Sequence, residues 1–247
     1  KNCFCKHFKL SYVVVVVYFQ LNYFRLFRSF QELTGTTDPP VTSKAKITSK
    51  TGNWILENSG NELTNTTCKN GKSTLASGIA LYMLTKDGED GAEVYAVATK
   101  KDQAKIVWDE AKKMIKKSPE LNELCKCRIN GIFYDLTESV FKALASDSNS
   151  LDGLNAQFVV ADEVHAWKDK NLLDVMRDSM SARERPLLLE TSTMGTVRES
   201  VFDNEYEYGS QVIEGKIIDE TILPVIYELD NVEEWTNEES WYKANPR

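Results

Sequence analysis

Between positions 73 and 193, segments that suit helices alternate with short apolar runs that suit strands. Residues 102–116 carry apolar residues at helical intervals. Helices are also expected over residues 73–84 (STLASGIALYML), which open directly after Gly71 and Lys72, and over residues 171–180. Short, mostly apolar runs occupy residues 93–99, 140–145, 158–161 and 187–193. Runs of this length and composition suit buried strands. The pattern therefore predicts helices and strands in alternation.

This alternation favours one fold class. Strands that alternate with helices indicate a mainly parallel sheet with helices on both faces, which is the doubly wound α/β class. Open sheets of this class bind ligands at the carboxyl ends of their strands. Candidate chemistry is therefore expected where residues 158–161 and 187–193 end.

The first 67 residues have a different texture. Residues 12–19 (YVVVVVYF) form an apolar run too short for the ~20 residues of a membrane-spanning helix, and their β-branched content favours a buried strand over membrane contact. Residues 30–67 are polar and rich in turn formers, which predicts loop or poorly ordered chain. We therefore expect the folded domain to begin near residue 68.

Charge and cysteine content exclude some functions. The net charge of -7 over 247 residues means that any contact with nucleic acid must come from a local basic cluster. Five cysteines form no Cys-x-x-Cys pair, and only His7 and His165 could complete a metal site with them. We interpret the cysteines as reduced thiols of a cytosolic protein. A chain that begins at Lys1 rather than Met is expected to be a fragment.

Residues 68–74 (CKNGKST) contain the second half of a phosphate-binding P-loop, G-x-x-x-x-G-K-[ST], whose first glycine is replaced by Thr66. In such loops the backbone N–H groups and the start of the following helix surround the phosphates. Lys72 would reach the β- and γ-phosphates, and Ser73 would ligate Mg²⁺. On its own the tripeptide is weak evidence. Its significance depends on a second motif.

The second motif is FVVADE at residues 158–163, a strand followed by two acids. Asp162 would hold Mg²⁺ through water, and Glu163 would orient and deprotonate the attacking water. The alternative is an ordinary surface turn after a strand. With Gly71, Lys72 and Ser73 upstream and strands in the right places between, the combination indicates a P-loop ATPase that uses ATP and Mg²⁺.

Residues 69–246 resemble the ATPase domain of tailed-bacteriophage terminase large subunits. The resemblance is carried by KNGKSTLASGIALYML, VYAVATKKDQAKIVWDEAKKM, LDGLNAQFVVADEVHAWKDKNLLDVMRDSMSARERPLLLETSTMGT, EGKIIDETILPVIYELDNVEEW and KANP. It implies an ASCE-type P-loop fold and a motor that packages double-stranded DNA into procapsids. It also implies a homo-oligomeric ring at the portal protein, a terminase small subunit as partner, no membrane, and a location in the host bacterial cytoplasm.

Two departures from the family pattern leave an alternative open. The family commonly lacks the first P-loop glycine, but it has arginine where this chain has Cys68, and a cysteine supplies no such charge. Residues 61–67 (NELTNTT) are too polar for the strand that should lead into the loop. The alternative is a catalytically inactive terminase-like fragment that keeps the fold without a productive nucleotide site.

The resemblance assigns roles to further positions. In the loop, Lys69, Asn70, Gly71 and Thr74 would contact nucleotide with Lys72 and Ser73. Thr191, Ser192 and Thr193 would form the family's coupling motif, which senses the γ-phosphate, or simply be a polar strand end that caps a turn. Gln103 would contact nucleotide or DNA, or be an exposed amide. Arg183 or Arg185 would act as an arginine finger on a neighbouring subunit, or lie on the surface; Arg183 is our candidate.

The remaining matched positions are assigned to packing or to solvent. His165 and Trp167 are predicted to pack rather than bind metal. A basic run on the second helix is predicted to be a solvated face, with phosphate contact as the alternative; it contains Lys112, Lys113, Lys116 and Lys117.

The resemblance also suggests three parts. Residues 1–67 are unassigned and either foreign or diverged, and residues 68–214 form the ATPase domain, incomplete at its start. Residues 215–247 end that domain and lead toward an absent nuclease domain. The acids at 219–220 and 230–239 are assigned to this connecting region, without clustered apolar strands behind them to build a second metal site.

Overall fold

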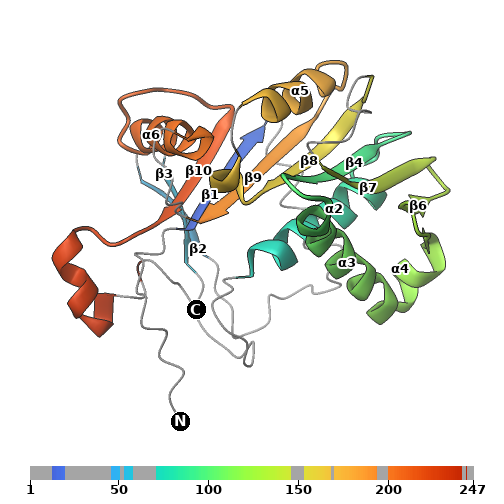
Figure 1. Ribbon diagram of the computed structural model, residues 1–247, viewed down its shortest axis with the longest axis horizontal. Helices are drawn as coiled ribbons and strands as arrows, with labels where there is room; N and C mark the ends of the chain where they lie inside the picture. The colour runs from blue at the N-terminus through green and yellow to red at the C-terminus, as the bar shows by residue number, and fades with distance from the viewer. Residues whose placement is uncertain are drawn as a thin grey trace, which may run out of the picture.

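The computed structural model describes residues 13–19, 46–50, 53–57, 71–145, 153–167, 170–193, 200–240 and 243. Their centre is an eight-stranded sheet with the order β10-β1-β9-β8-β4-β7-β6-β5 (Figure 1). In that order the strands are β10 (Ile222–Tyr227), β1 (Val13–Phe19), β9 (Leu187–Thr193), β8 (Ala156–Asp162), β4 (Glu93–Ala98), β7 (Ser139–Ala145), β6 (Ile132–Tyr134) and β5 (Cys125–Cys127). A separate hairpin pairs β2 (Lys46–Lys50) with β3 (Asn53–Glu57).

The middle of the sheet is parallel. β4 pairs in parallel with β7 and β8, and β8 with β9, whereas β1 and β6 are antiparallel to their neighbours. The helices are α2 (Lys72–Thr85), α3 (Lys101–Lys117), α4 (Pro119–Leu124), α5 (Asn171–Ser179) and α6 (Val201–Ile213). Short 3-10 turns cover Val164–Ala166 (η1), Val232–Thr236 (η2) and Glu238–Ser240 (η3). Figure 1 shows α2 and α3 on one face and α5 and α6 on the other, which confirms the doubly wound prediction.

Two buried cores explain why the strands read as continuous apolar runs. Side chains alternate between the faces of a strand, so Val94 and Ala96 of β4 pack toward α2 and α3, whereas Tyr95 and Val97 pack toward α5 and α6. β8 divides in the same way. Each large side chain buried here stabilises the fold by about 1.5–3 kcal/mol relative to an exposed one.

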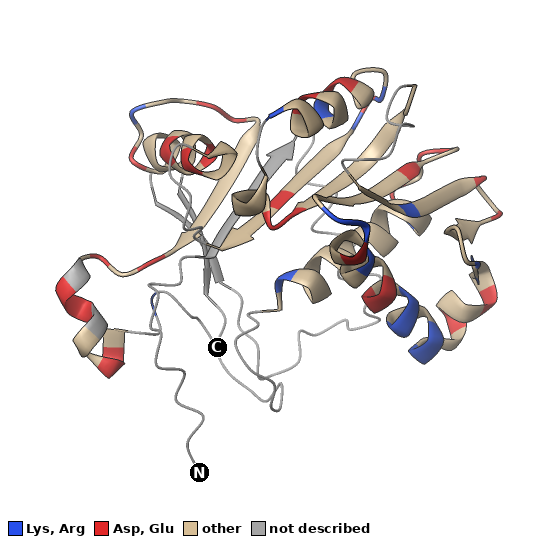
Figure 2. Cartoon of the chain, viewed as in Figure 1, with Lys and Arg blue, Asp and Glu red and all other residues tan. Residues whose placement is uncertain are grey.

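Helix α3 buries one face. α3 buries Ala104, Val107, Trp108, Ala111 and Ile115 and leaves its lysines outside. Figure 2 shows that these basic residues line α3, while acidic residues dominate α6 and the segment after β10. Lys112 stacks over the Trp108 ring at 4.2 Å and Lys113 pairs with Glu110, so part of the basic run is engaged within its own helix. This agrees with the predicted solvated face.

A charged cluster with two buried acids lies between α5, α6 and β9. Arg177 pairs with Glu190 at 2.9 Å and with Glu205 at 3.3 Å, and Oε2 of Glu190 has no hydrogen-bond partner among the described residues. Burial, reinforced by the nearby Glu205 carboxylate and opposed by Arg177, raises the pKa of Glu190 from 4.5 to about 8. The cluster therefore makes stability depend on pH.

We expect Glu190→Gln to flatten that dependence. Between pH 4.5 and about 8 the folded chain holds a proton on Glu190 that the unfolded chain has released, so the free energy of unfolding falls as the pH rises. Urea unfolding at pH 5 and pH 8 should show the native chain losing at least about 1 kcal/mol more than the variant. Equal losses would contradict the assignment.

Three segments depart from the predictions. β2 and β3 lie within residues 30–67, where loop was predicted. β10 lies within residues 215–247, where no strand was predicted, and it pairs with β1 at the edge of the main sheet. Pro224 obscures its pattern, because proline is uncommon inside strands and is tolerated at a sheet edge, where β10 lies. The short α4, β5 and β6, and helix α6, were not predicted.

β1 confirms the strand predicted at residues 12–19. It lies between β9 and β10 and runs antiparallel to both, with Val13 opposite Thr193 and Phe19 opposite Leu187. Its last residue is therefore at the amino end of β9, away from the edge where β8 and β9 end.

None of the helices in the described part of the chain has the length and apolar content of a membrane span.

Candidate active site

The start of α2 and the ends of β8 and β9 meet at the carboxyl edge of the sheet. Nζ of Lys72, in the first turn of α2, lies 3.6 Å from Oε1 of Glu163, which directly follows β8. The two side chains are 14% and 32% exposed. Two motifs far apart in the sequence are thus in contact at the edge where a doubly wound sheet binds its ligands.

Gly71 gives α2 its starting geometry. It is the N-cap residue with φ 75° and ψ 7°, in the left-handed region, where any side chain is strained even though a Cβ there would meet no other atom within 4 Å. Its carbonyl accepts from Leu75 N–H at 2.9 Å. No side chain among the described residues caps α2, and its first turn, which includes Ser73 and Thr74, contains no acid. The helix start is therefore suited to an anion. Lys69, Asn70 and Cys68 lie outside the described residues.

Asp162 is the last residue of β8 and is only 4% exposed. Its partner in the sheet register is Thr191, whose hydroxyl donates to Oδ1 at 2.6 Å; the Glu163 N–H donates to the same oxygen at 3.0 Å. Burial raises the pKa of Asp162, an effect that the Thr191 hydrogen bond and the Lys72 charge oppose. Among the described residues these hydrogen bonds all go to Oδ1, so Oδ2 can take another partner, such as a cation.

Glu163 has an unusual backbone. Its φ of 54° and ψ of 47° place a non-glycine residue in the left-handed region, a conformation that costs about 1–3 kcal/mol and often occurs at functional sites. The turn aims the carboxylate at two partners. Oε1 faces Lys72, and Oε2 lies 3.2 Å from Nδ1 of His165.

His165 connects this acid to the end of β9. Its backbone N–H donates to Oγ of Ser192 at 3.0 Å, and its Nδ1 lies 3.2 Å from the same oxygen. The prediction that His165 only packs therefore missed a polar role. Trp167 does pack, at 3% exposure, and its indole N–H donates to the Asp162 carbonyl at 3.1 Å. The position of His165 two residues after Glu163 was the available signal.

Gln103 and Thr193 lie near the edge without touching the acids. Gln103, in the first turn of α3, accepts a hydrogen bond from Thr99, just beyond the end of β4, at 3.0 Å. Thr193 ends β9, and its carbonyl accepts from the Ser192 hydroxyl at 2.9 Å. Their roles toward nucleotide remain predictions.

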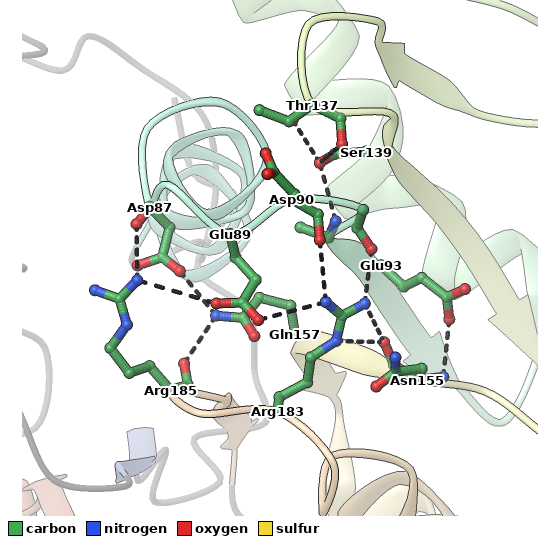
Figure 3. Close-up of polar contacts among 12 residues, drawn as sticks. Asp87, Glu89, Asp90, Glu93, Thr137, Ser139, Asn155, Gln157, Arg183 and Arg185 are labelled. Carbon is green, nitrogen blue, oxygen red and sulfur yellow. Dashed lines mark hydrogen bonds and ion pairs between the residues drawn. The ribbon is translucent and has the colours of Figure 1, made fainter.

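Arg183 is at the opposite edge. Figure 3 shows its guanidinium enclosed near the amino ends of β4 and β8, where it donates to the carbonyls of Asn155, Asp90 and Gly91 and pairs with Glu89. Its side chain is 9% exposed. An arginine finger needs a guanidinium free to enter a neighbour's site, so this position does not fit that prediction and we do not retain Arg183 as a catalytic residue. Arg185, 31% exposed, binds the Asp87 carbonyl.

Comparison with known proteins places this geometry in a family. A family model described as the terminase large subunit, ATPase domain, matches residues 61–211. The chain belongs to this terminase family. The match begins upstream of Lys72 and extends beyond Asp162, Glu163 and β9, so it includes the whole edge described above.

Individual relatives agree. The terminase large subunit of Enterobacteria phage HK97 is 28% identical over 185 residues, covering 72% of this chain and 35% of that protein. That of Lactococcus phage p2 is 23% identical over 181 residues, covering 71% and 33%. The crystal structure of the HK97 large terminase superposes with a TM-score of 0.64 at 25% identity, covering 72% and 37% of the two chains. The chain thus spans about a third of the length of these terminases.

Proposed function

We propose that this terminase domain hydrolyses ATP at the edge formed by α2, β8 and β9. The observation that carries the proposal is the 3.6 Å contact between Lys72 and Glu163, because it unites a phosphate-binding residue with a candidate general base. Glu163 is half-buried and acceptor-only when ionised, as a base requires.

The chain's own groups divide the work. The N–H groups at the start of α2 and the Lys72 ammonium would bind the phosphates, since both favour negative charge. Oε1 of Glu163 would take a proton from water as the water oxygen bonds to the γ-phosphorus. The bond from that phosphorus to the bridging oxygen breaks, and its electron pair stays on the leaving ADP.

Phosphate must first displace Lys72 from Glu163. A partly exposed ion pair of this kind stabilises by at most about 1 kcal/mol. A micromolar ligand binds with about 8 kcal/mol. The contact is therefore a resting arrangement that ATP can open at little cost.

We propose that Asp162 and Ser73 would hold a Mg²⁺ ion. Hard cations prefer oxygen ligands, and Asp162 offers Oδ2 while Thr191 and the Glu163 amide hold Oδ1. When bound with ATP, the ion would neutralise phosphate charge. Among the described residues no three His, Cys, Asp or Glu side chains form a metal cluster, which suits an ion held largely by substrate phosphate and water.

We expect Thr191→Val to weaken the apparent Mg²⁺ affinity by about 10- to 100-fold, because partners that orient a ligating carboxylate have effects of that size. A Mg²⁺ titration of ATP hydrolysis measures it. Thr191→Ser keeps the hydroxyl and should stay close to the native chain. Equal Mg²⁺ requirements in Thr191→Val and the native chain would remove Thr191 from the site.

The wider role follows from the family. We propose that hydrolysis drives packaging of double-stranded DNA into procapsids, in the host bacterial cytoplasm, within a homo-oligomeric ring that meets the portal protein and a terminase small subunit. Support comes from the family match and from the HK97 relative. Stimulation of ATP hydrolysis by double-stranded DNA would test this role separately from the site.

A second candidate is an inactive terminase-like domain. Two observations favour it: Cys68 replaces an arginine of the family pattern, and β1 ends at the edge away from Lys72 rather than leading into the loop. Such a domain would keep the fold and lack productive nucleotide binding.

The deciding experiment is Mg²⁺-dependent binding of a fluorescent ATP analogue to the native chain, Lys72→Ala and Cys68→Arg. We expect native binding that weakens at least tenfold in Lys72→Ala, through loss of a charge-assisted contact worth about 1.5–3 kcal/mol. Binding that needs Cys68→Arg would favour the inactive domain. No binding in any of the three would contradict the proposed site.

A further inference from the structure

The two oxygens of the Glu163 carboxylate have different partners. Oε1 faces Lys72 at 3.6 Å, and Oε2 faces Nδ1 of His165 at 3.2 Å. An incoming phosphate would compete with Glu163 for Lys72, because the Lys72 ammonium would bind the phosphate. The phosphate would not compete for His165. Binding of nucleotide would therefore free Oε1 and leave Oε2 where it is.

The partners of His165 determine which ring nitrogen carries hydrogen. A carboxylate only accepts hydrogen bonds, so the contact with Oε2 needs Nδ1–H. The Ser192 hydroxyl donates to the Thr193 carbonyl at 2.9 Å, so it too can only accept from the ring. Both partners thus favour the Nδ1–H form.

The ring itself is anchored to β9. Ser192 is 3% exposed and accepts from the His165 backbone N–H at 3.0 Å. The next residue toward the amino end, Thr191, binds Asp162. The end of one strand therefore holds both acids, Asp162 directly and Glu163 through the imidazole.

We propose that His165 is a positioning residue for Glu163: its ring, whose Nδ1 contacts the Ser192 hydroxyl, keeps the same nitrogen 3.2 Å from Oε2 and leaves Oε1 as the oxygen that receives the proton from water. This rests on the proposed ATP hydrolysis. The strained backbone of Glu163 agrees with it, since a left-handed turn is maintained only when its surroundings fix it. His165 touches neither phosphate nor water in this role.

The resting contact can be tested without hydrolysis. The chain has two histidines, His7 and His165, so ¹⁵N-histidine labelling in a His7→Gln background yields a single ring spectrum. We expect the Nδ1–H form in the nucleotide-free chain and its loss in Glu163→Ala and in Ser192→Ala. An Nε2–H ring in the native background, or one indifferent to Glu163→Ala, would overturn the proposal.

Steady-state kinetics test the consequence. His165→Ala should lower kcat at least tenfold and change KM less than threefold, because the phosphate contacts are untouched. His165→Asn should recover most of kcat, since its amide N–H can donate from a similar place. A buried packing role would not be restored by asparagine. Equal kcat in His165→Ala and the native chain would overturn the proposal.

The two experiments separate this inference from the proposed function. A chain that binds and hydrolyses no ATP would contradict the proposed function, while the ring spectra would still show whether His165 holds Glu163. A chain that hydrolyses ATP with an unchanged rate in His165→Ala would keep the function and reject the positioning role.

Discussion

Glu163→Gln is expected to lower the rate of ATP hydrolysis by about 10²–10⁴-fold while ATP binding persists, because a positioned general base contributes that much. Glutamine keeps the size of the side chain, and its amide oxygen can stay beside Nδ1 of His165, where Oε2 of Glu163 lies in the native chain. It cannot take a proton from water. The loss should therefore appear in kcat rather than in the affinity for nucleotide.

The matched control for this change is Glu184→Gln, which makes the same acid-to-amide change at an exposed residue next to Arg183, at the opposite edge of the sheet. Its kcat should match the native value. Phosphate release and binding of the fluorescent analogue would be measured on the same preparations. A Glu163→Gln chain with native kcat would show that another group is the base.

Arg183→Ala is expected to destabilise the domain by about 3 kcal/mol, since the loss of a buried charged partner costs about 3–5 kcal/mol and water can reach part of this site. The guanidinium ties the turn before β4 to the start of β8 through carbonyls of Gly91 and Asn155, at 2.6 and 3.0 Å (Figure 3). Without it those carbonyls lose a charged donor. Thermal unfolding should shift by about 6–12 °C.

Arg185→Ala is the control for this change. Its side chain is 31% exposed and its closest ion-pair distance is 4.0 Å, so we expect a loss within about 1 kcal/mol. Comparable losses in the two variants would mean that Arg183 does not carry the connection. A normal melting temperature with lost DNA-stimulated hydrolysis in Arg183→Ala would instead restore the arginine-finger hypothesis.

Local pattern predicted the elements that are long or strongly apolar. β4, β8 and β9 are buried on both faces and read as apolar runs, and α3 shows its inward side through residues such as Val107 and Ala111. β10 was not predicted because it is an edge strand that contains a proline. β5 and β6 were not predicted because a strand of three residues is too short to show a period. Such strands form because they pair with strands that are distant in the sequence.

The site was predicted in the same uneven way. Lys72, Asp162 and Glu163 follow from spacing, because a helix start and a strand end can be located in the sequence. The contact between His165 and Ser192 depends on the left-handed backbone conformation of Glu163. The residue types in this segment do not predict that conformation. For Arg183 the opposite holds. The motif suggested a role for an arginine at this position, but only the fold shows that it lies at the edge of the sheet away from Lys72 and Glu163.

The position of β1 has a consequence for synthesis. Its backbone pairs with Thr193 and Tyr227 at one end, so β1 cannot pair until the much later strands β9 and β10 have been made. At 5–20 residues per second the ribosome leaves an interval of roughly 10 to 40 s. Throughout it a run of five valines has no native partner, and such runs readily pair with copies of themselves. The yield of folded chain should therefore depend on the rate of translation and on how chaperones shield residues 13–17.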